Sequence, residues 1–146
     1  MKLLLDAHAL LWFCDGNAAL SASARAAIED PVNEKHVSRV TAWEVAIKVS
    51  LGKLKLAVPY DDLFPVAVAS NGFQVLPLDF QHFRELLALP FHHRDPFDRL
   101  LIAQAVTERM TLVSCEPHFP AYQVPLLWLS LSIDHTHSET GASTAR

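Results

Sequence analysis

The chain has 146 residues, of which 51% are hydrophobic and 19% are charged, and its formal net charge is -4. This composition is typical of one folded domain with a substantial core, and it argues against disorder. The net charge gives no global basic surface for nucleic acid, so a polyanionic substrate would have to be held locally. The two cysteines form no Cys-x-x-Cys pair, so we expect reduced thiols rather than a disulfide or a zinc site.

Short apolar runs alternate with longer helical patterns along the chain. In chain order, we expect a strand at 2–6, helices at 8–14 and 21–30, a strand at 36–40, helices at 41–51 and 60–70, a strand at 73–77, helices at 80–88 and 97–109, and strands at 111–114 and 126–129. This alternation indicates βα units and a parallel sheet. We expect residues 1–129 to form one domain and residues 130–146, which are rich in Ser, Thr and His, to form a flexible tail.

Four acidic residues stand close to the ends of predicted strands or at the start of a predicted helix. Asp6 follows the first strand, Glu44 comes shortly after the second, Glu116 follows the fourth, and Asp98 opens a helix. Ligands of open α/β sheets bind at the carboxyl ends of the strands, so we expect these side chains to converge. Asp6 is the strongest candidate, because a carboxylate directly after a buried strand is costly to desolvate without a partner. Carboxylates attract Mg²⁺ or Mn²⁺, and the sequence therefore predicts a divalent-metal site.

Helix capping is a simpler interpretation for two of these acids. Thr41 and Glu44 have the spacing of a capping box, in which each residue bonds to the backbone of the other. Asp95, Pro96 and Asp98 fit the N-cap, first and third positions of a helix, where an acid also interacts well with the helix dipole. Taken alone, each acid is as well explained by a cap as by a catalytic role.

The eight histidines suggest zinc at first sight, above all the adjacent pair His92 and His93. Adjacent residues rarely supply the convergent geometry of a zinc site and no cysteine is near, so we expect these histidines at the surface. His8 differs, because it lies two residues after Asp6 and should be close to the same edge of the sheet. Asp79 precedes a predicted helix and is interpreted as its N-cap rather than as a site residue.

Three segments carry a resemblance to a known family: LLLDAHALLW at 3–12, TAWEVAIK at 41–48 and HRDPFDRLLIAQA at 93–105. Together they resemble a PIN-domain protein, and specifically a VapC-like toxin of a bacterial type II toxin-antitoxin system, over about residues 2 to 129. The resemblance implies an α/β fold, a three-layer α/β/α sandwich with a five-stranded parallel sheet. It also implies Mg²⁺- or Mn²⁺-dependent endoribonuclease activity on an RNA substrate, homodimerisation, and inhibition by a VapB-like antitoxin.

The resemblance also implies the site residues, position by position. The implied catalytic and metal-binding residues are Asp6, Glu44, Asp98 and Glu116. Asp95 would act as an auxiliary acid or as the helix cap, and Ser114 would support the ligands from outside the metal site. The implied reaction is hydrolysis of an RNA phosphodiester by metal-activated water, without a side-chain nucleophile.

Two positions depart from the family pattern. The family commonly has Asp-Thr-His after the first strand and Asp at the position of Glu116, whereas this chain has Ala7 and a longer acid. Mg²⁺ demands ligands at about 2.0 to 2.1 Å, so the extra methylene of Glu116 bears most on a second metal. An alternative therefore stays open, a catalytically impaired module that binds an antitoxin or RNA without turnover. A nuclease acting on DNA is also compatible with the acids, and only the resemblance favours RNA.

The candidate contacts to a nucleic-acid backbone are Lys48, Lys53, Lys55, Arg94 and Arg99, and each is equally well explained as solvated surface. The apolar run at the amino terminus is interrupted by Asp6 and His8, well short of a signal-peptide core or a membrane span. We therefore expect a cytoplasmic protein without membrane contact.

Overall fold

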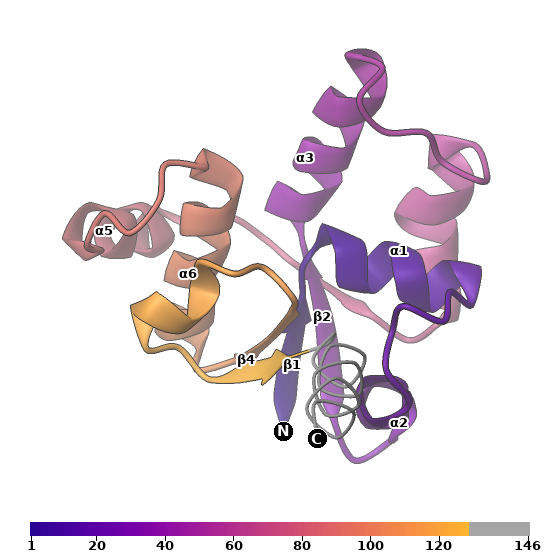
Figure 1. The fold of residues 1–146 in the computed structure, drawn as a ribbon, viewed down its shortest axis with the longest axis horizontal. Helices are drawn as coiled ribbons and strands as arrows, with labels where there is room; N and C mark the ends of the chain where they lie inside the picture. Colours follow the sequence, from indigo (N-terminus) through magenta and orange to yellow (C-terminus); the bar gives the residue numbers. More distant parts are fainter. Residues whose placement is uncertain (129–146) are drawn as a thin grey trace, which may run out of the picture.

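The computed structural model describes residues 1–128, and the predicted tail at 130–146 lies outside the described residues. Five parallel strands form one sheet in the order β3-β2-β1-β4-β5. Their bounds are β1 Lys2–Leu5, β2 Glu34–Ser38, β3 Gln74–Leu76, β4 Thr111–Ser114 and β5 Leu126–Trp128. The predicted five-stranded parallel sheet is confirmed, with β1 at its centre (Figure 1).

Helices connect the strands and pack on both faces of the sheet. Their bounds are α1 Ala7–Asp15, α2 Ala22–Glu29, α3 Arg39–Ser50, α4 Val68–Ser70, α5 Phe80–Ala88 and α6 Pro96–Glu108, with a π-helical segment η1 at Asp62–Ala67 and a 3-10 turn η2 at Phe119–Tyr122. The helix predicted at 60–70 is therefore not continuous but has a kink inside η1. Phe64 breaks the helical pattern, since it has extended backbone angles and precedes Pro65.

Alternation along β1 builds a separate core on each face of the sheet. Leu3 and Leu5 point to one face and pack with buried residues of α1, α2 and α4, while Leu4 points to the other and packs with buried residues of α6. Figure 1 shows α1 and α2 on one side of the strands and α5 and α6 on the other. The predicted three-layer α/β/α sandwich is confirmed.

The start of α3 differs from the prediction. Ser38, the last residue of β2, is the N-cap, and its hydroxyl accepts from Val40 N at 3.0 Å and donates to Gln104. Thr41 lies inside the helix, and its buried hydroxyl has no hydrogen-bond partner among the described residues. The capping box of Thr41 and Glu44 is therefore wrong, because the chain turns three residues earlier than the pattern suggested. Glu44 is left free of a capping role.

The sheet topology brings distant segments to one edge. Leu5, at the end of β1, pairs with Val37 of β2 and with Val113 of β4. The residues that follow these strands consequently share the carboxyl edge of the sheet, above which α3 rises in Figure 1. In the part of the chain that the structure describes, no helix has the length and apolar character needed to span a membrane.

Candidate active site

A small polar pocket of about 70 Å³ lies at the carboxyl edge of the sheet. Its lining residues are Asp6, Ala7, His8, Glu44, Lys48, Asp95, Asp98 and Glu116. The four acids predicted as site residues therefore line one pocket, although they come from four separate segments. His8 lies at this edge, as expected from its position after Asp6. We call this arrangement the carboxylate pocket.

Asp6 is held rigidly at the base of α1. It is the N-cap of that helix, where its Oδ1 accepts from Ala9 N at 2.9 Å, and its Oδ2 accepts from the Ser114 hydroxyl at 2.5 Å. Burial raises the pKa of Asp6, while the hydrogen bonds from Ser114 and Ala9 work in the opposite direction. Asp6 is thus both a cap and a pocket residue, with a charge that a nearby cation would stabilise.

The sequence left open which of Asp95 and Asp98 is a helix cap and which is a pocket acid. In the structure, Asp95 is the cap and Asp98 is the pocket acid without a capping role. Asp95 is the N-cap of α6, and its Oδ1 accepts from Phe97 N at 2.9 Å and Asp98 N at 3.1 Å, with Pro96 in the first turn. Asp98 makes no such bond. Burial, followed by the charges of Asp95, Glu44 and the other pocket acids, raises the pKa of Asp98 to about 8. The pocket therefore holds more negative charge than its own groups neutralise.

Lys48 is the main internal counter-charge of the pocket. Its Nζ lies 2.6 Å from Glu44 Oε2, one turn away on α3. Burial lowers the pKa of Lys48, but the hydrogen bond to Glu44 and the charges of Glu44, Asp95 and Asp98 outweigh it, so the net shift is upward. One ammonium thus faces five carboxylates in the pocket lining.

Arg99 does not supply a second cation to this pocket. It is buried, its Nη1 donates to Pro90 O at 2.7 Å, and its guanidinium stacks 3.9 Å from the centre of the Phe91 ring. Its interpretation as a candidate nucleic-acid contact or as solvated surface is wrong on both counts, because the side chain is occupied with the loop between α5 and α6.

Two histidines that the sequence interpretation placed at the surface or left aside lie against the pocket acids. His93 is nearly buried, and its Nε2 is 3.4 Å from Asp98 Oδ2. His118 Nδ1 is 2.7 Å from Glu116 Oε1, and the two imidazole rings stack at 4.8 Å with an angle of 2°. The expectation of a surface position for His93 is wrong. Its place five residues before Asp98 in the same segment was the available signal.

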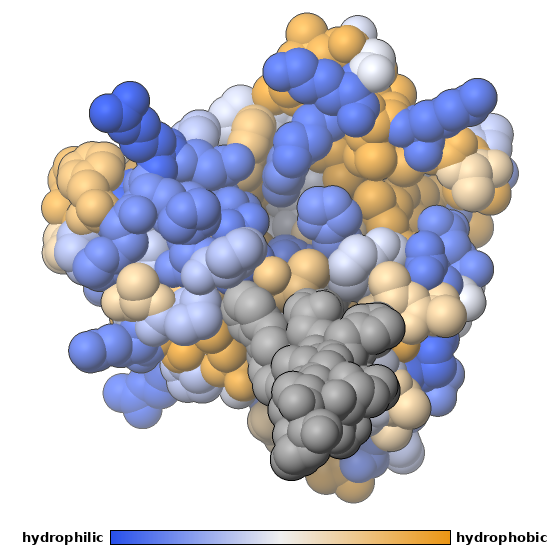
Figure 2. All heavy atoms as spheres, in the orientation of Figure 1, coloured by the Kyte–Doolittle hydropathy of each residue, from blue (hydrophilic) through white to orange (hydrophobic). Residues whose placement is uncertain are grey.

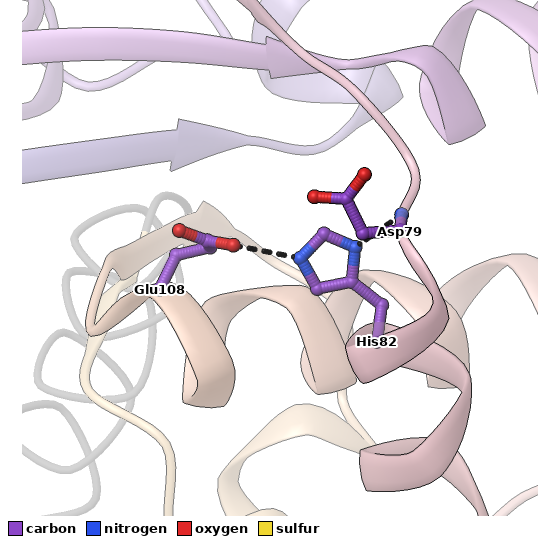
Figure 3. Close-up of side chains that lie close together, drawn as sticks. All are labelled: Asp79, His82 and Glu108. Carbon is purple, nitrogen blue, oxygen red and sulfur yellow. Dashed lines mark hydrogen bonds and ion pairs between the residues drawn. The ribbon is translucent and has the colours of Figure 1, made fainter.

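A second cluster has metal-like composition but lies elsewhere. Ligand atoms of Asp79, His82 and Glu108 come within 4.8 Å of one another (Figure 3), and this is the one group of three potential metal ligands found so close together among the described residues. His82 Nδ1 accepts from Asp79 N at 3.0 Å, so its ring proton lies on Nε2, which is 2.8 Å from Glu108 Oε2. A cation on Nε2 would force that proton onto Nδ1, against the amide. Both nitrogens of His82 therefore already have hydrogen-bond partners, and the cluster links α5 to α6. Asp79 is the N-cap of α5, as expected.

Comparison with known proteins identifies the family. The PIN domain family model matches residues 3–124. The chain belongs to the PIN-domain family. No curated protein matches the sequence. The predicted family and the predicted α/β fold are confirmed by this match.

Solved structures share this PIN fold. A chain of VapBC2 from Rickettsia felis bound to a promoter DNA fragment gives a TM-score of 0.69 at 14% identity, covering 89% of this chain and 100% of that chain. FitAB bound to IR36 DNA gives 0.62 at 17% identity, covering 86% and 93%. VapBC-5 from Mycobacterium tuberculosis, of the VapBC family of toxin-antitoxin systems, gives 0.57 at 16% identity, covering 89% and 98%. The resemblance to VapC-like proteins thus holds at the level of the fold.

Proposed function

We propose that this PIN-domain protein is a divalent-metal-dependent endoribonuclease and the toxin of a type II toxin-antitoxin pair. The observation that carries the proposal is the carboxylate pocket, where four separate segments place acids around one small space and the pKa of Asp98 rises to about 8. Uncompensated carboxylates at the ligand-binding edge of an α/β sheet have the chemistry of a site for a hard cation.

The donor set of the pocket fits Mg²⁺ or Mn²⁺, because the lining offers carboxylate oxygens and no thiol. Asp6, Asp98 and Glu44 would hold the ion, with Glu116 as a further ligand. When bound, such a cation neutralises the clustered carboxylates and lowers the pKa of a coordinated water. The Ser114 hydroxyl and Ala9 amide fix the orientation of Asp6 for this task.

Other residues of the pocket would contact the substrate. Lys48 is the lysine of the pocket lining, so it is the best placed of the candidate cations to bind the scissile phosphate. Its ion pair with Glu44 is half-exposed on the Lys48 side, which leaves the ammonium able to exchange one anionic partner for another. Asp95, as the α6 cap, would keep Asp98 directed at the pocket.

A hydrophobic groove beside α1 would receive the antitoxin. It has a volume of about 310 Å³, and its apolar lining includes Leu11, Trp12, Leu54, Leu56 and Val58. Figure 2 shows hydrophobic surface (orange) near this region, between α3 and the η1–α4 segment. An amphipathic segment of a VapB-like partner could bury its apolar face there. His8 lines both the groove and the carboxylate pocket, so a partner in the groove would lie next to the site. Homodimerisation and a cytoplasmic location belong to the same proposal.

A second candidate function is a PIN module that binds an antitoxin or RNA without turnover. Glu116 favours it, because one carboxylate oxygen is already 2.7 Å from His118 Nδ1. A carboxylate engaged in this way is a weaker metal ligand than the shorter acid that the family commonly has. This candidate predicts a folded protein that binds its partner and cuts no RNA.

Cleavage of a mixed pool of structured RNA tests the two candidates. Purified, antitoxin-free protein is assayed with Mg²⁺, Mn²⁺ or EDTA, beside an Asp6→Asn/Asp98→Asn double variant. We expect metal-dependent cutting that the double variant loses. Folded wild-type protein that leaves the pool intact would support the silent module, while cutting retained by the variant would overturn the assignment of these acids.

A further inference from the structure

The Tyr122 hydroxyl lies near several hydrogen-bond donors of the segment that leads into Asp95 and Asp98. It lies 3.2 Å from both His92 N and His93 N and 3.3 Å from Arg99 Nη1, and the Tyr122 side chain is buried. Its fourth polar neighbour is His93 Nδ1 at 3.0 Å. One residue of η2 therefore holds the loop that leads into Asp95 and Asp98, although the two segments are more than 20 residues apart.

These contacts fix the direction of the hydroxyl proton. Backbone amides and a guanidinium can only donate, so toward these three neighbours the hydroxyl oxygen can act only as an acceptor, with its two lone pairs shared among them. Its own proton then has one acceptor among these neighbours, His93 Nδ1. A neutral imidazole that accepts at Nδ1 carries its proton at Nε2. His93 Nε2 is the atom that lies 3.4 Å from Asp98 Oδ2.

Arg99 acts only as a hydrogen-bond donor to Tyr122, and this fixes the direction of the hydrogen bonds that follow. The guanidinium is buried and its partners are the carbonyls of Pro90, Leu86 and Leu89, with no carboxylate of the described residues in ion-pair contact. It cannot lose a proton under ordinary conditions, so it keeps the hydroxyl of Tyr122 turned toward His93. Donation consequently runs in one direction, from Arg99 to Tyr122, from Tyr122 to His93, and from His93 to Asp98.

We propose that Tyr122 is a positioning residue that holds His93 in its Nε2–H tautomer and thereby orients the Asp98 carboxylate. One oxygen of Asp98 faces the imidazole, and the other stays available to the pocket. His93 also stacks on His118, whose Nδ1 lies 2.7 Å from Glu116 Oε1. The effect on metal binding rests on the proposed function of the carboxylate pocket, whereas the tautomer itself does not.

The tautomer is measured directly by ¹⁵N NMR of the histidine rings in the wild-type protein. Spectra are recorded at alkaline pH in EDTA, where rings are neutral, and His93 is assigned by the signals absent from a His93→Gln variant. We expect a protonated Nε2 and an unprotonated Nδ1. A His93 ring with its proton on Nδ1 would overturn the proposal, and this measurement requires no Tyr122 variant to fold.

A Tyr122→Phe variant tests the consequence, with Tyr60→Phe as the matched control. The Tyr60 hydroxyl donates a partly buried hydrogen bond to Ala42 O at 2.7 Å. Tyr60 itself lies outside the lining of the carboxylate pocket. We expect Tyr122→Phe to populate both His93 tautomers and to weaken Mn²⁺ binding about tenfold, as for other supporting partners of metal ligands. Tyr60→Phe should change neither quantity.

The outcomes separate this proposal from the nuclease assignment. A Tyr122→Phe protein with the wild-type tautomer and unchanged Mn²⁺ affinity would contradict the positioning role even if RNA is cut normally. Conversely, a tautomer that shifts as expected in a protein that binds Mn²⁺ but cuts no RNA would uphold the positioning role and contradict the nuclease. For an active protein, we expect Tyr122→Phe to lower kcat about tenfold at nearly constant KM.

Discussion

Two clusters of potential metal ligands can be compared in this molecule, and we propose that the closer-packed one is the poorer metal site. Asp79, His82 and Glu108 lie within 4.8 Å of one another, yet both nitrogens of His82 already have partners that dictate its tautomer. The carboxylate pocket is looser, but it has five acids, one lysine and a carboxyl group with a pKa of about 8. Unneutralised charge, rather than proximity alone, therefore distinguishes a site that needs a cation.

The largest expected effect is on RNA cleavage, which should depend on the carboxylate pocket and not on the cluster of Asp79, His82 and Glu108. Asp98→Asn should lower RNA cleavage at least about 100-fold, since even supporting partners of metal ligands are worth 10- to 100-fold. Glu108→Gln should leave cleavage within about twofold, because its carboxylate belongs to the α5–α6 tie. Initial rates with Mn²⁺ measure both. Equal losses in the two variants would erase the distinction between the clusters.

The pH dependence of stability provides a second test. The pKa of the Asp98 carboxyl is 3.8 in an unfolded chain and is raised to about 8 in the folded protein by burial and the neighbouring acids. Between these values the folded state binds the Asp98 proton more tightly than the unfolded chain does, so the contribution of Asp98 to the free energy of unfolding should fall as the pH rises from 4 to 8. At about 1.4 kcal/mol per pKa unit, the loss should amount to about 3 to 6 kcal/mol in EDTA.

Urea unfolding of wild type and Asp98→Asn at pH 5 and pH 8.5 isolates this contribution. Wild type should lose stability relative to the variant as the pH rises, and saturating Mn²⁺ should restore it by about 3 kcal/mol at 100 times the dissociation constant. If the difference in the free energy of unfolding between the two proteins were independent of pH, the pKa of Asp98 would not be raised by burial and its neighbours.

Disruption of the other cluster should affect stability without affecting metal binding. His82 is fully buried, so His82→Gln should cost about 1 to 3 kcal/mol by leaving Glu108 and the Asp79 amide with poorer partners. Mn²⁺ affinity should not change. Isothermal titration calorimetry and thermal unfolding give the two quantities, and a loss of Mn²⁺ binding in this variant would restore the cluster as a metal site.

The smallest expected effect concerns Lys48. Lys48→Met removes the internal cation from the carboxylate pocket, so Mn²⁺ affinity should rise about threefold, in line with about 0.2 to 1 kcal/mol for a partly exposed ion pair. The KM for RNA should rise in the same variant. Lys53→Met is the control, since Lys53 is exposed and outside the pocket lining. Weaker Mn²⁺ binding by Lys48→Met would contradict its role as a competing charge.

The sheet and the pocket acids could be predicted because their signals are local. The short apolar runs of β1 and β4 define strands, and the residue after a parallel strand lies at a known edge of the sheet. The cap at Asp95 was equally visible, since Asp and Pro at consecutive positions fix the start of α6. The grouping of these acids followed from that shared edge, and the resemblance to the PIN family implied their roles.

Other features depend on contacts between distant segments, which a local pattern does not contain. Ser38 caps α3 in a position where its hydroxyl also meets Gln104, 66 residues away. The His93 side chain is nearly buried because Tyr122 and His118 pack on it from the segment after β4. The sequence interpretation placed the α3 cap and this histidine wrongly for the same reason.

Anomalous scattering from crystals of the protein grown with Mn²⁺ would show directly whether the carboxylate pocket binds the metal. We expect a peak in the carboxylate pocket between Asp6, Asp98 and Glu44, and none at His82. A peak bound by Asp79, His82 and Glu108, with the carboxylate pocket free of Mn²⁺, would contradict this expectation.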